Sequence, residues 1–335
     1  MHRKKTILSL LWAMLLFGFT LYAALDTFVI EHSYAAVEEK ASPAASTEEG
    51  LPTPIQAVEI TPEASPLNEA AQTVTISPTP EATEAPMEAE AVISTENQYS
   101  DGNVSITIEE IRAYDSTIYV ADVVLSSSEY LQTALANDVY GRNVTAKTSS
   151  IAESANAVLA INGDYYGARE SGYVIRNGVL YRSKAKKNAE DLVIYADGSF
   201  EIINESQISA QALLDNGAWN VLSFGPALLI DGEIAVDVND EVGQAKASNP
   251  RTAIGIVDEL HYLFVVSDGR TSASDGLSLR ELAQVLQDLG ATTAYNLDGG
   301  GSSTMVFQGQ IVNNPTSNGK RITERSVSDI VCIAC

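Results

Sequence analysis

The sequence predicts an α+β fold, with a mixed, largely antiparallel sheet and a few packed helices, preceded by a transmembrane helix and a disordered stalk. Three observations predict this architecture: the change in composition along the chain, the recurring turn dipeptides and the small number of helical patterns. The first 34 residues are apolar, the next 63 are strongly biased in composition, and from Gln98 onward the composition is that of a globular protein. Turn dipeptides between strand-like runs recur in this last part, whereas helical patterns are few. We therefore divide the chain into residues 1–34, 35–97 and 98–335.

The amino-terminal segment is predicted to anchor the chain in a membrane. Arg3, Lys4 and Lys5 precede an uncharged stretch over residues 6–25, which has the length of a membrane-spanning helix. Basic residues on this side favour a cytoplasmic amino terminus, so we expect a single pass through the cell membrane with the carboxy-terminal domain extracellular. A signal peptide cleaved near residues 33–36 is the alternative, and the protein would then be secreted.

The second segment reads as an extended stalk. Residues 35–97 hold eight of the eleven prolines, twelve glutamates and one lysine, and they contribute −11 to the net charge of −24. Such a composition buries too little apolar surface to offset the entropy of ordering the chain. The remaining residues are also acidic, which excludes nucleic acid as a partner.

The globular segment shows hairpin signals. Three turn dipeptides each separate two apolar runs: Asn177-Gly178, Asp197-Gly198 and Asp231-Gly232. Such dipeptides are typical of tight turns between antiparallel strands. A purely parallel, doubly wound sheet is therefore not expected.

Two helices are predicted, and each feeds a strand that ends in a polar turn. Ser278 and Glu281 form a capping-box pattern before an apolar stripe that ends at Gly290, and the strand after it delivers "NLDGGGSS". A second helix over residues 148–155 precedes the strand "AVLAIN", which ends in "GDYYG".

The stretch "NLDGGGSS" is the best candidate for a ligand site. Consecutive glycines after a buried strand allow backbone angles and close approaches that side chains forbid. Asp298 would offer a carboxylate there, beside backbone N–H groups and hydroxyls from the residues that follow: Gly299, Gly300, Gly301, Ser302 and Ser303. A simple glycine bend is the alternative, because the stretch matches neither a Walker loop nor a dinucleotide fingerprint.

Three arginines adjoin other strand-like runs and could hold an anion. Arg251 lies in "NPRTAIG", Arg270 in "SDGR" and Arg325 in "ERS". Arginine makes bidentate, charge-assisted hydrogen bonds to phosphate oxygens, which an acidic protein needs if its ligand is anionic. A surface ion pair is the alternative for each of them.

No metal site can be assigned from the sequence. Cys332 and Cys335 have the spacing of half a zinc site, but no second cysteine pair exists and the three histidines are scattered. We expect no required cofactor. A divalent cation held by Asp and Asn oxygens stays possible, although no calcium-binding loop of known spacing is present.

The motifs "NPRTAIG", "DGR", "GLSLRELAQVL", "NLDGGGSSTMV" and "ERSVSDIVCI" occur in an order and spacing that resemble the phosphodiester glycosidase family. The likeness runs from about Ala157 to Cys332 and is greatest to bacterial, exopolysaccharide-associated members. One departure is "INGDYY", where Asp164 stands in place of a glycine that the family usually has.

The resemblance implies hydrolysis of a glycosyl-1-phosphodiester, with an α-N-acetylglucosaminyl group as one possibility, through an oxocarbenium-like transition state. Its substrate would be a glycan or sugar phosphodiester. The roles that it implies are these: Arg251 and Arg325, with Arg270 beside them, bind the phosphate, Asp298 acts as base or nucleophile, Asp268 or Asp164 is a second carboxylate, and Asn162 and Asn296 bind sugar hydroxyls.

Two other functions are alternatives to a phosphodiester glycosidase. A surface module that binds a glycan without cleaving it would use the same cleft, but it has less need for arginine and aspartate together. A peptidase or esterase would need a nucleophile and a base, and "GGGSS" is no nucleophile elbow, while His261 is the lone histidine after residue 98.

Overall fold

The computed structural model describes residues 2–36, 92–238 and 248–334. Most of the predicted stalk lies outside these residues. Its last part, however, forms strand β2 (Ile93–Ser94), which pairs with β3 (Gln98–Ser100). The folded part therefore begins before the predicted boundary at residue 98.

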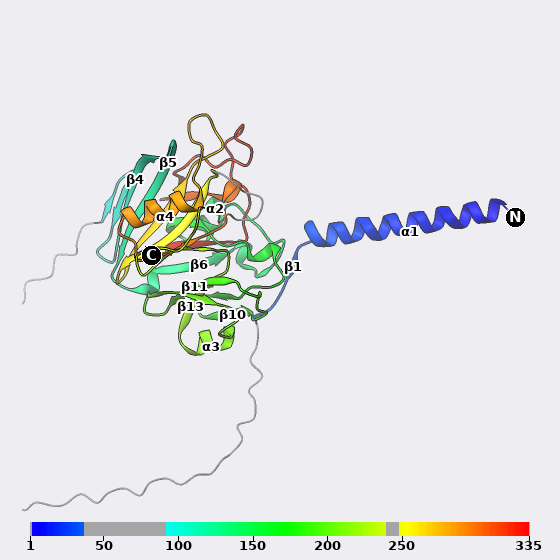
Figure 1. Cartoon of the computed structure of the whole chain (residues 1–335), viewed down its shortest axis with the longest axis horizontal. Helices are drawn as coiled ribbons and strands as arrows, with labels where there is room; N and C mark the ends of the chain where they lie inside the picture. Colours follow the sequence, from blue (N-terminus) through cyan, green and yellow to red (C-terminus); the bar gives the residue numbers. More distant parts are fainter. Residues whose placement is uncertain (1, 37–91, 239–247, 335) are drawn as a thin grey trace, which may run out of the picture. The chain divides into compact units, whose positions relative to one another are not determined.

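The amino-terminal segment forms helix α1 (His2–Phe28), followed by the short strand β1 (His32–Ser33), which pairs with β7 (Gly141–Arg142). Among the described residues, no helix combines the length and the apolar character that crossing a membrane requires. The predicted transmembrane segment is thus helical, but the structure does not support it as a span (Figure 1).

The remaining strands form three larger antiparallel sheets. In spatial order the nine-stranded sheet contains β15 (Glu233–Ile234), β14 (Ala227–Ile230), β18 (Thr293–Asn296), β16 (Arg251–Asp258), β17 (His261–Ser267), β5 (Ser116–Leu125), β4 (Val104–Ala113), β3 and β2. One five-stranded sheet contains β20 (Gln310–Ile311), β19 (Met305–Phe307), β8 (Ala157–Asn162), β21 (Asp329–Ala334) and β6 (Leu131–Leu135). The other contains β10 (Val179–Arg182), β9 (Val174–Arg176), β13 (Ala218–Leu222), β11 (Glu190–Tyr195) and β12 (Phe200–Asn204).

The central strands of the nine-stranded sheet are buried on both faces, as the alternation along β5 shows. Ala121 and Val123 point into a core shared with the two five-stranded sheets, and Ile118 and Val120 point the other way into a core made with helix α4 (Leu279–Asp288). Side chains alternate across a strand, so one run of apolar residues serves two layers.

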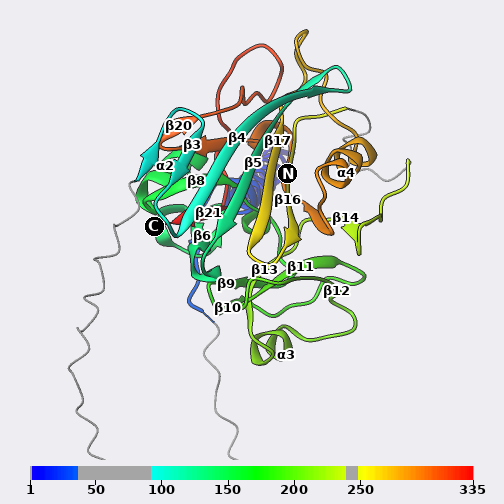
Figure 2. The same ribbon diagram turned by 90° about the vertical axis from the view of Figure 1, so that its left-hand side faces the viewer.

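The other helices cover the smaller sheets. Helix α2 (Thr148–Ser154) packs Ile151 and Ala152 against β8 and β21, and α3 (Ala210–Asp215) packs Leu213 against β9 and β13. Figure 2 shows α3 beside the sheet of β9, β13, β11 and β12. Short 3-10 turns occur at Ser128–Tyr130, Ala136–Asp138, Tyr166–Ala168 and Gly300–Ser302.

The predicted local elements are confirmed. Ser278 and Glu281 make both hydrogen bonds of the capping box at the start of α4, and α2 covers the predicted residues to within one position. The three predicted turns join β9 to β10, β11 to β12, and β14 to β15. Asn177 and Gly178 both have positive φ, as a two-residue hairpin turn requires.

Candidate active site

The site is built around the loop that follows β18. Asp298 comes two residues after the strand, and its carbonyl accepts a 2.6 Å hydrogen bond from the Asn162 side chain at the end of β8. Its backbone N–H donates to the carbonyl of Gly163, and Leu297 N–H donates to Thr252 on β16. Two sheets therefore fix the backbone of Asp298.

Neighbouring groups approach the three glycines so closely that side chains are excluded. A Cβ on Gly299 would lie 2.9 Å from the carbonyl oxygen of Pro250, and one on Gly301 would lie 2.2 Å from Ser317 Oγ. Gly300 also has a positive φ of 63°, and a Cβ there would lie 2.9 Å from an Arg270 guanidinium nitrogen. The glycines allow the loop to pack beneath these groups, so the site is more than a simple bend.

The Asp298 carboxylate is held at its inner oxygen. Oδ2 accepts from Ser302 Oγ at 2.6 Å and from Arg325 Nη2 at 2.9 Å, and Arg325 also donates to Ser302 Oγ. The side chain of Asp298 is 13% exposed, against 45% for Arg325. Burial raises the pKa of Asp298 above its ordinary value of 3.8, although Arg325 and the Ser302 hydroxyl oppose the rise.

Two hollows meet at Asp298 and Arg325. One, of about 160 Å³, also contains Arg251, Arg270 and Phe224 along its wall. The other, of about 200 Å³, is bordered by the turn after β8 and by the segment before β21. Three guanidinium groups and one carboxyl group thus line the first hollow, and this excess of positive charge favours an anion there.

Arg251 and Arg270 are held in place from behind. Arg251 Nε donates to the carbonyl of Leu277 at 2.8 Å, and Arg270 donates to the side chain of Asn249 and to the carbonyl of Ser317. Such anchoring orients a guanidinium before any ligand arrives, so less side-chain entropy is lost on binding.

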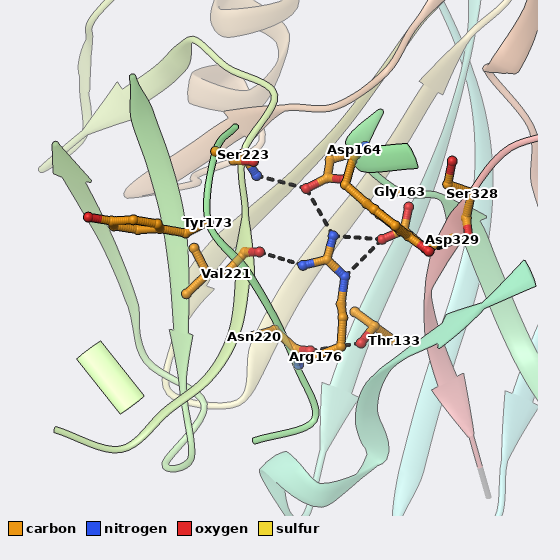
Figure 3. A network of polar contacts seen from close by, with 12 residues as sticks. Thr133, Gly163, Asp164, Tyr173, Arg176, Asn220, Val221, Ser223, Ser328 and Asp329 are labelled. Atoms are coloured by element: carbon orange, nitrogen blue, oxygen red, sulfur yellow. Dashed lines mark hydrogen bonds and ion pairs between the residues drawn. The ribbon is translucent and has the colours of Figure 1, made fainter. Parts of the chain in front are cut away.

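A buried ion cluster lies next to the second hollow, which together with the first hollow we call the cleft. Arg176 Nη2 lies 2.9 Å from Asp164 Oδ2 and 2.7 Å from Asp329 Oδ2, and all three side chains are almost fully buried (Figure 3). Asp164 also accepts from the backbone N–H groups of Tyr166 and Ser223.

One guanidinium cannot balance two buried carboxylates, and the pair responds unequally. Burial would raise the pKa of Asp164, but Arg176 and the N–H group of Ser223 outweigh it, so this pKa is lowered. Burial raises the pKa of Asp329 to about 8. Arg176 therefore favours the ionised form of Asp164, whereas burial favours the protonated form of Asp329.

The structure brings only some of the residues predicted from the sequence into contact with the hollows. Asp298, Arg325, Arg251, Arg270, Gly299, Gly300 and Asp164 line them. Asp164, however, is fully buried and its oxygens are taken up by Arg176 and backbone N–H groups, so the structure shows it as part of the support.

The other predicted residues lie behind the cleft. Asp268 accepts from Asn313 and Asn314, which ties two loops together away from both hollows. Asn162 and Asn296 are buried and hydrogen-bonded to backbone carbonyl groups. Their predicted contacts with sugar hydroxyls are therefore not supported by the geometry. Buried in the loop itself are Gly301, Ser302 and Ser303.

Sequence reasoning missed Arg169, Arg176 and Asp329. Arg169 lies over the ring of Phe224, 5.0 Å from its centroid, and its charge lowers the pKa of Asp298. It lies two residues after the turn "GDYYG", which could have marked it as a fourth candidate cation. Arg176 and Asp329 lie within apolar strands and carried no comparable signal.

No His, Cys, Asp or Glu side chains gather in groups of three or more that could hold a metal ion, within the part of the chain that the structure describes. The hollow at Arg251 and Arg270 combines one carboxyl group, that of Asp298, with the guanidinium groups of Arg251, Arg270 and Arg325. Such a set of groups repels a cation and attracts an anion.

Residues 155–334 match the family model of the phosphodiester glycosidases. The chain belongs to this family. The match covers the range over which the sequence showed its likeness, including Asp298 and all three predicted arginines.

Curated relatives agree. The chain is 30% identical over 192 residues to an SPbeta prophage-derived uncharacterized protein, YomE, of Bacillus subtilis, an alignment that covers 55% of this chain and 29% of that protein. It is 28% and 35% identical to the N-acetylglucosamine-1-phosphodiester alpha-N-acetylglucosaminidases of Mus musculus and Homo sapiens, over 56% of this chain and 40% of each of them. The chain thus spans less than half the length of these relatives.

Solved structures show the same fold. The catalytic domain of zebrafish N-acetylglucosamine-1-phosphodiester alpha-N-acetylglucosaminidase aligns with a TM-score of 0.56 at 22% identity, over 69% of this chain and 83% of that one. A hypothetical protein from Synechocystis aligns with a TM-score of 0.54 at 16% identity, over 69% of this chain and 62% of its own.

Proposed function

We propose that this phosphodiester glycosidase domain hydrolyses a glycosyl-1-phosphodiester, with an α-N-acetylglucosaminyl group as the first candidate sugar. The observation that carries the proposal is the pairing of Asp298 with Arg325 where two hollows meet, with Arg251 and Arg270 facing the same loop. The names of the mouse and human relatives, which act on such a linkage, support the choice of substrate.

The phosphate is assigned to the hollow that holds Arg251 and Arg270. Their guanidinium groups, with Arg325, would donate to the phosphate oxygens and neutralise the charge of the diester. The anomeric carbon would then lie toward Asp298, since Asp298 and Arg325 are the two groups that border both hollows.

The nature of the leaving group explains why hydrolysis needs only one carboxylate, that of Asp298, at the anomeric carbon. Among the residues that line the two hollows, the acidic ones are Asp164 and Asp298, and Asp164 is engaged by Arg176. When the bond between the anomeric carbon and oxygen breaks, the electron pair leaves with a phosphomonoester, whose second pKa is about 6. Arginines can stabilise this leaving group without a strong general acid.

Asp298 supplies the other half of the reaction. As a base it would take a proton from the attacking water, and as a nucleophile it would form a glycosyl ester that water then hydrolyses. Both routes need the ionised carboxylate. The product anomer separates them, because the base route inverts the configuration and the nucleophile route retains it.

The test is Asp298→Asn in the full chain, which keeps the size of the side chain and removes its charge. We expect release of free sugar from a glycosyl-1-phosphodiester to fall by on the order of 10³ or more while the protein stays folded. Asp258→Asn, an exposed aspartate at the end of β16, is the matched control and should be fully active. Full activity of Asp298→Asn would exclude the assignment.

We further propose that the reaction takes place outside the cell, on cell-envelope or exopolysaccharide glycans. The support is the basic residues and the uncharged stretch at the amino terminus, which favour export. Protease treatment of intact cells that carry a carboxy-terminal tag tests this setting. The tag should be removed from intact cells, and a tag protected until lysis would contradict export.

A further inference from the structure

A second group of buried oxygen atoms lies beside the cleft. Asp191 is on β11, Glu205 directly follows β12 and Ser223 directly follows β13. Strand pairing places Leu192 opposite Leu222 and Asp191 opposite Ile203. Asp191 and Ser223 are therefore neighbours across two strands, and Glu205, two residues after Ile203, projects from the same face.

These oxygen atoms are buried and mostly have no donor. Asp191 is 0% exposed, and no N–H or hydroxyl group of the described residues donates to its carboxyl oxygens, which interact with the carboxyl group of Glu205. Ser223 is 5% exposed, and its hydroxyl has no partner either. Glu205 accepts from the backbone N–H groups of Tyr173 and Lys186, which leaves lone pairs on both of its oxygens. An unsatisfied buried carboxylate is costly unless something neutralises it.

Two of the three side chains approach one point. A Cβ placed on Gly172 would lie 2.9 Å from Ser223 Oγ and 3.5 Å from Glu205 Oε1. Gly172 has a φ of 102°, so this position suits only glycine and the space stays free of a side chain. Asp191 lies across the strand pair from Ser223, and its carboxyl group interacts with that of Glu205.

The local charge calls for a cation. Arg176 is already paired with Asp164 and Asp329, so its charge neutralises those carboxylates and not Asp191 or Glu205. Among the described residues, no arginine, lysine or histidine side chain forms an ion pair with Asp191 or Glu205, so a bound cation would be their counter-charge.

We propose that Asp191, Glu205 and Ser223 form a binding site for a divalent, oxygen-preferring cation such as Ca²⁺. Carboxylate and hydroxyl oxygens without nitrogen or sulfur donors are the ligands that such ions choose.

The bound ion would stiffen one wall of the cleft. Ser223 N–H donates to Asp164, and its carbonyl accepts from Arg169, which stacks on Phe224. Fixing the Ser223 side chain would therefore hold the backbone that orients Asp164 and Arg169. The site takes no part in the proposed chemistry, so its test is independent of whether the domain hydrolyses a phosphodiester.

The test measures ion binding by the full chain after removal of metal with EDTA. We expect one Ca²⁺ per chain by equilibrium dialysis, and Tb³⁺ bound at the same site should show luminescence excited through the neighbouring Tyr173. With Ca²⁺ at about 100 times its dissociation constant, the melting temperature should rise by roughly 5 °C or more.

Variants locate the ion. Asp191→Asn should abolish binding, because the amide mimics the protonated acid, and Ser223→Ala should weaken binding about tenfold or more. Asp197→Asn, an exposed aspartate in the β11–β12 turn, should bind like the wild type. If Asp191→Asn does not fold, the wild-type stoichiometry and Ser223→Ala decide.

Two outcomes would overturn the site. The first is a metal-free wild type that binds neither Ca²⁺ nor Tb³⁺ and keeps its melting temperature, which would leave a proton shared by the two carboxyl groups as the explanation. The second is Ser223→Ala or a folded Asp191→Asn with wild-type affinity.

Discussion

Replacing Arg176 by Met should destabilise the domain strongly. The guanidinium contacts Asp164 at 2.9 Å and Asp329 at 2.7 Å, and its side chain is 2% exposed. Methionine fills a similar volume but leaves the ionised Asp164 without its buried partner. Breaking a buried ion pair from one side typically costs about 3–5 kcal/mol. For a domain of this size that loss corresponds to a drop in melting temperature of roughly 6–20 °C.

Urea unfolding followed by circular dichroism measures this loss. Arg112→Met is the matched control, because Arg112 is exposed on β4 and its removal should change the free energy of unfolding by less than about 1 kcal/mol. Asp329→Asn should cost less than Arg176→Met, because burial already favours the uncharged form of Asp329 and the amide is uncharged too. A loss below about 1 kcal/mol for Arg176→Met would refute the view that this cluster supports the cleft.

Three further changes test the site and the core. Arg325→Ala removes a charge that lowers the pKa of Asp298, so the acidic limb of the kcat/KM profile should move to higher pH, and an unchanged limb would argue against an ionised Asp298. Gly301→Ala should lower activity at least tenfold through its clash with Ser317, and adding Ser317→Gly should restore part of it in the same turnover assay. Leu286→Ala, fully buried in α4, should lower the free energy of unfolding by about 2–5 kcal/mol in urea.

Features that depend on neighbouring residues could be predicted from the sequence. Two such features are the capping box of Ser278 and Glu281 and the turn at Asn177 and Gly178. Each depends on residues at most three positions apart in the sequence, and both were confirmed. The division into separate sheets could not be predicted in this way. For example, β8 pairs with β19 and β21, which follow it by more than 140 residues, and no local pattern encodes such partners.

For the candidate site, too, the sequence predicted local motifs but not which side chains meet in space. Asp298 and Arg325 were both named from their motifs, and the structure brings them to 2.9 Å. Asp268 belongs to an equally polar motif, yet its side chain turns away from the hollows to bind Asn313 and Asn314. The direction of a side chain at the end of a strand depends on long-range packing. For the same reason Arg176 and Asp329, 153 residues apart, could not be paired beforehand.

Hydrolysis of an α-N-acetylglucosaminyl-1-phosphodiester by the full chain in ¹⁸O-labelled water tests the central claim most directly. Phosphorus and proton NMR would follow the two products, and mass spectrometry would locate the label. We predict equal amounts of free sugar and phosphomonoester, with no ¹⁸O in the phosphate, because the bond that breaks is the one between the anomeric carbon and oxygen. Label in the phosphate, or no release of sugar by wild-type protein, would contradict the account.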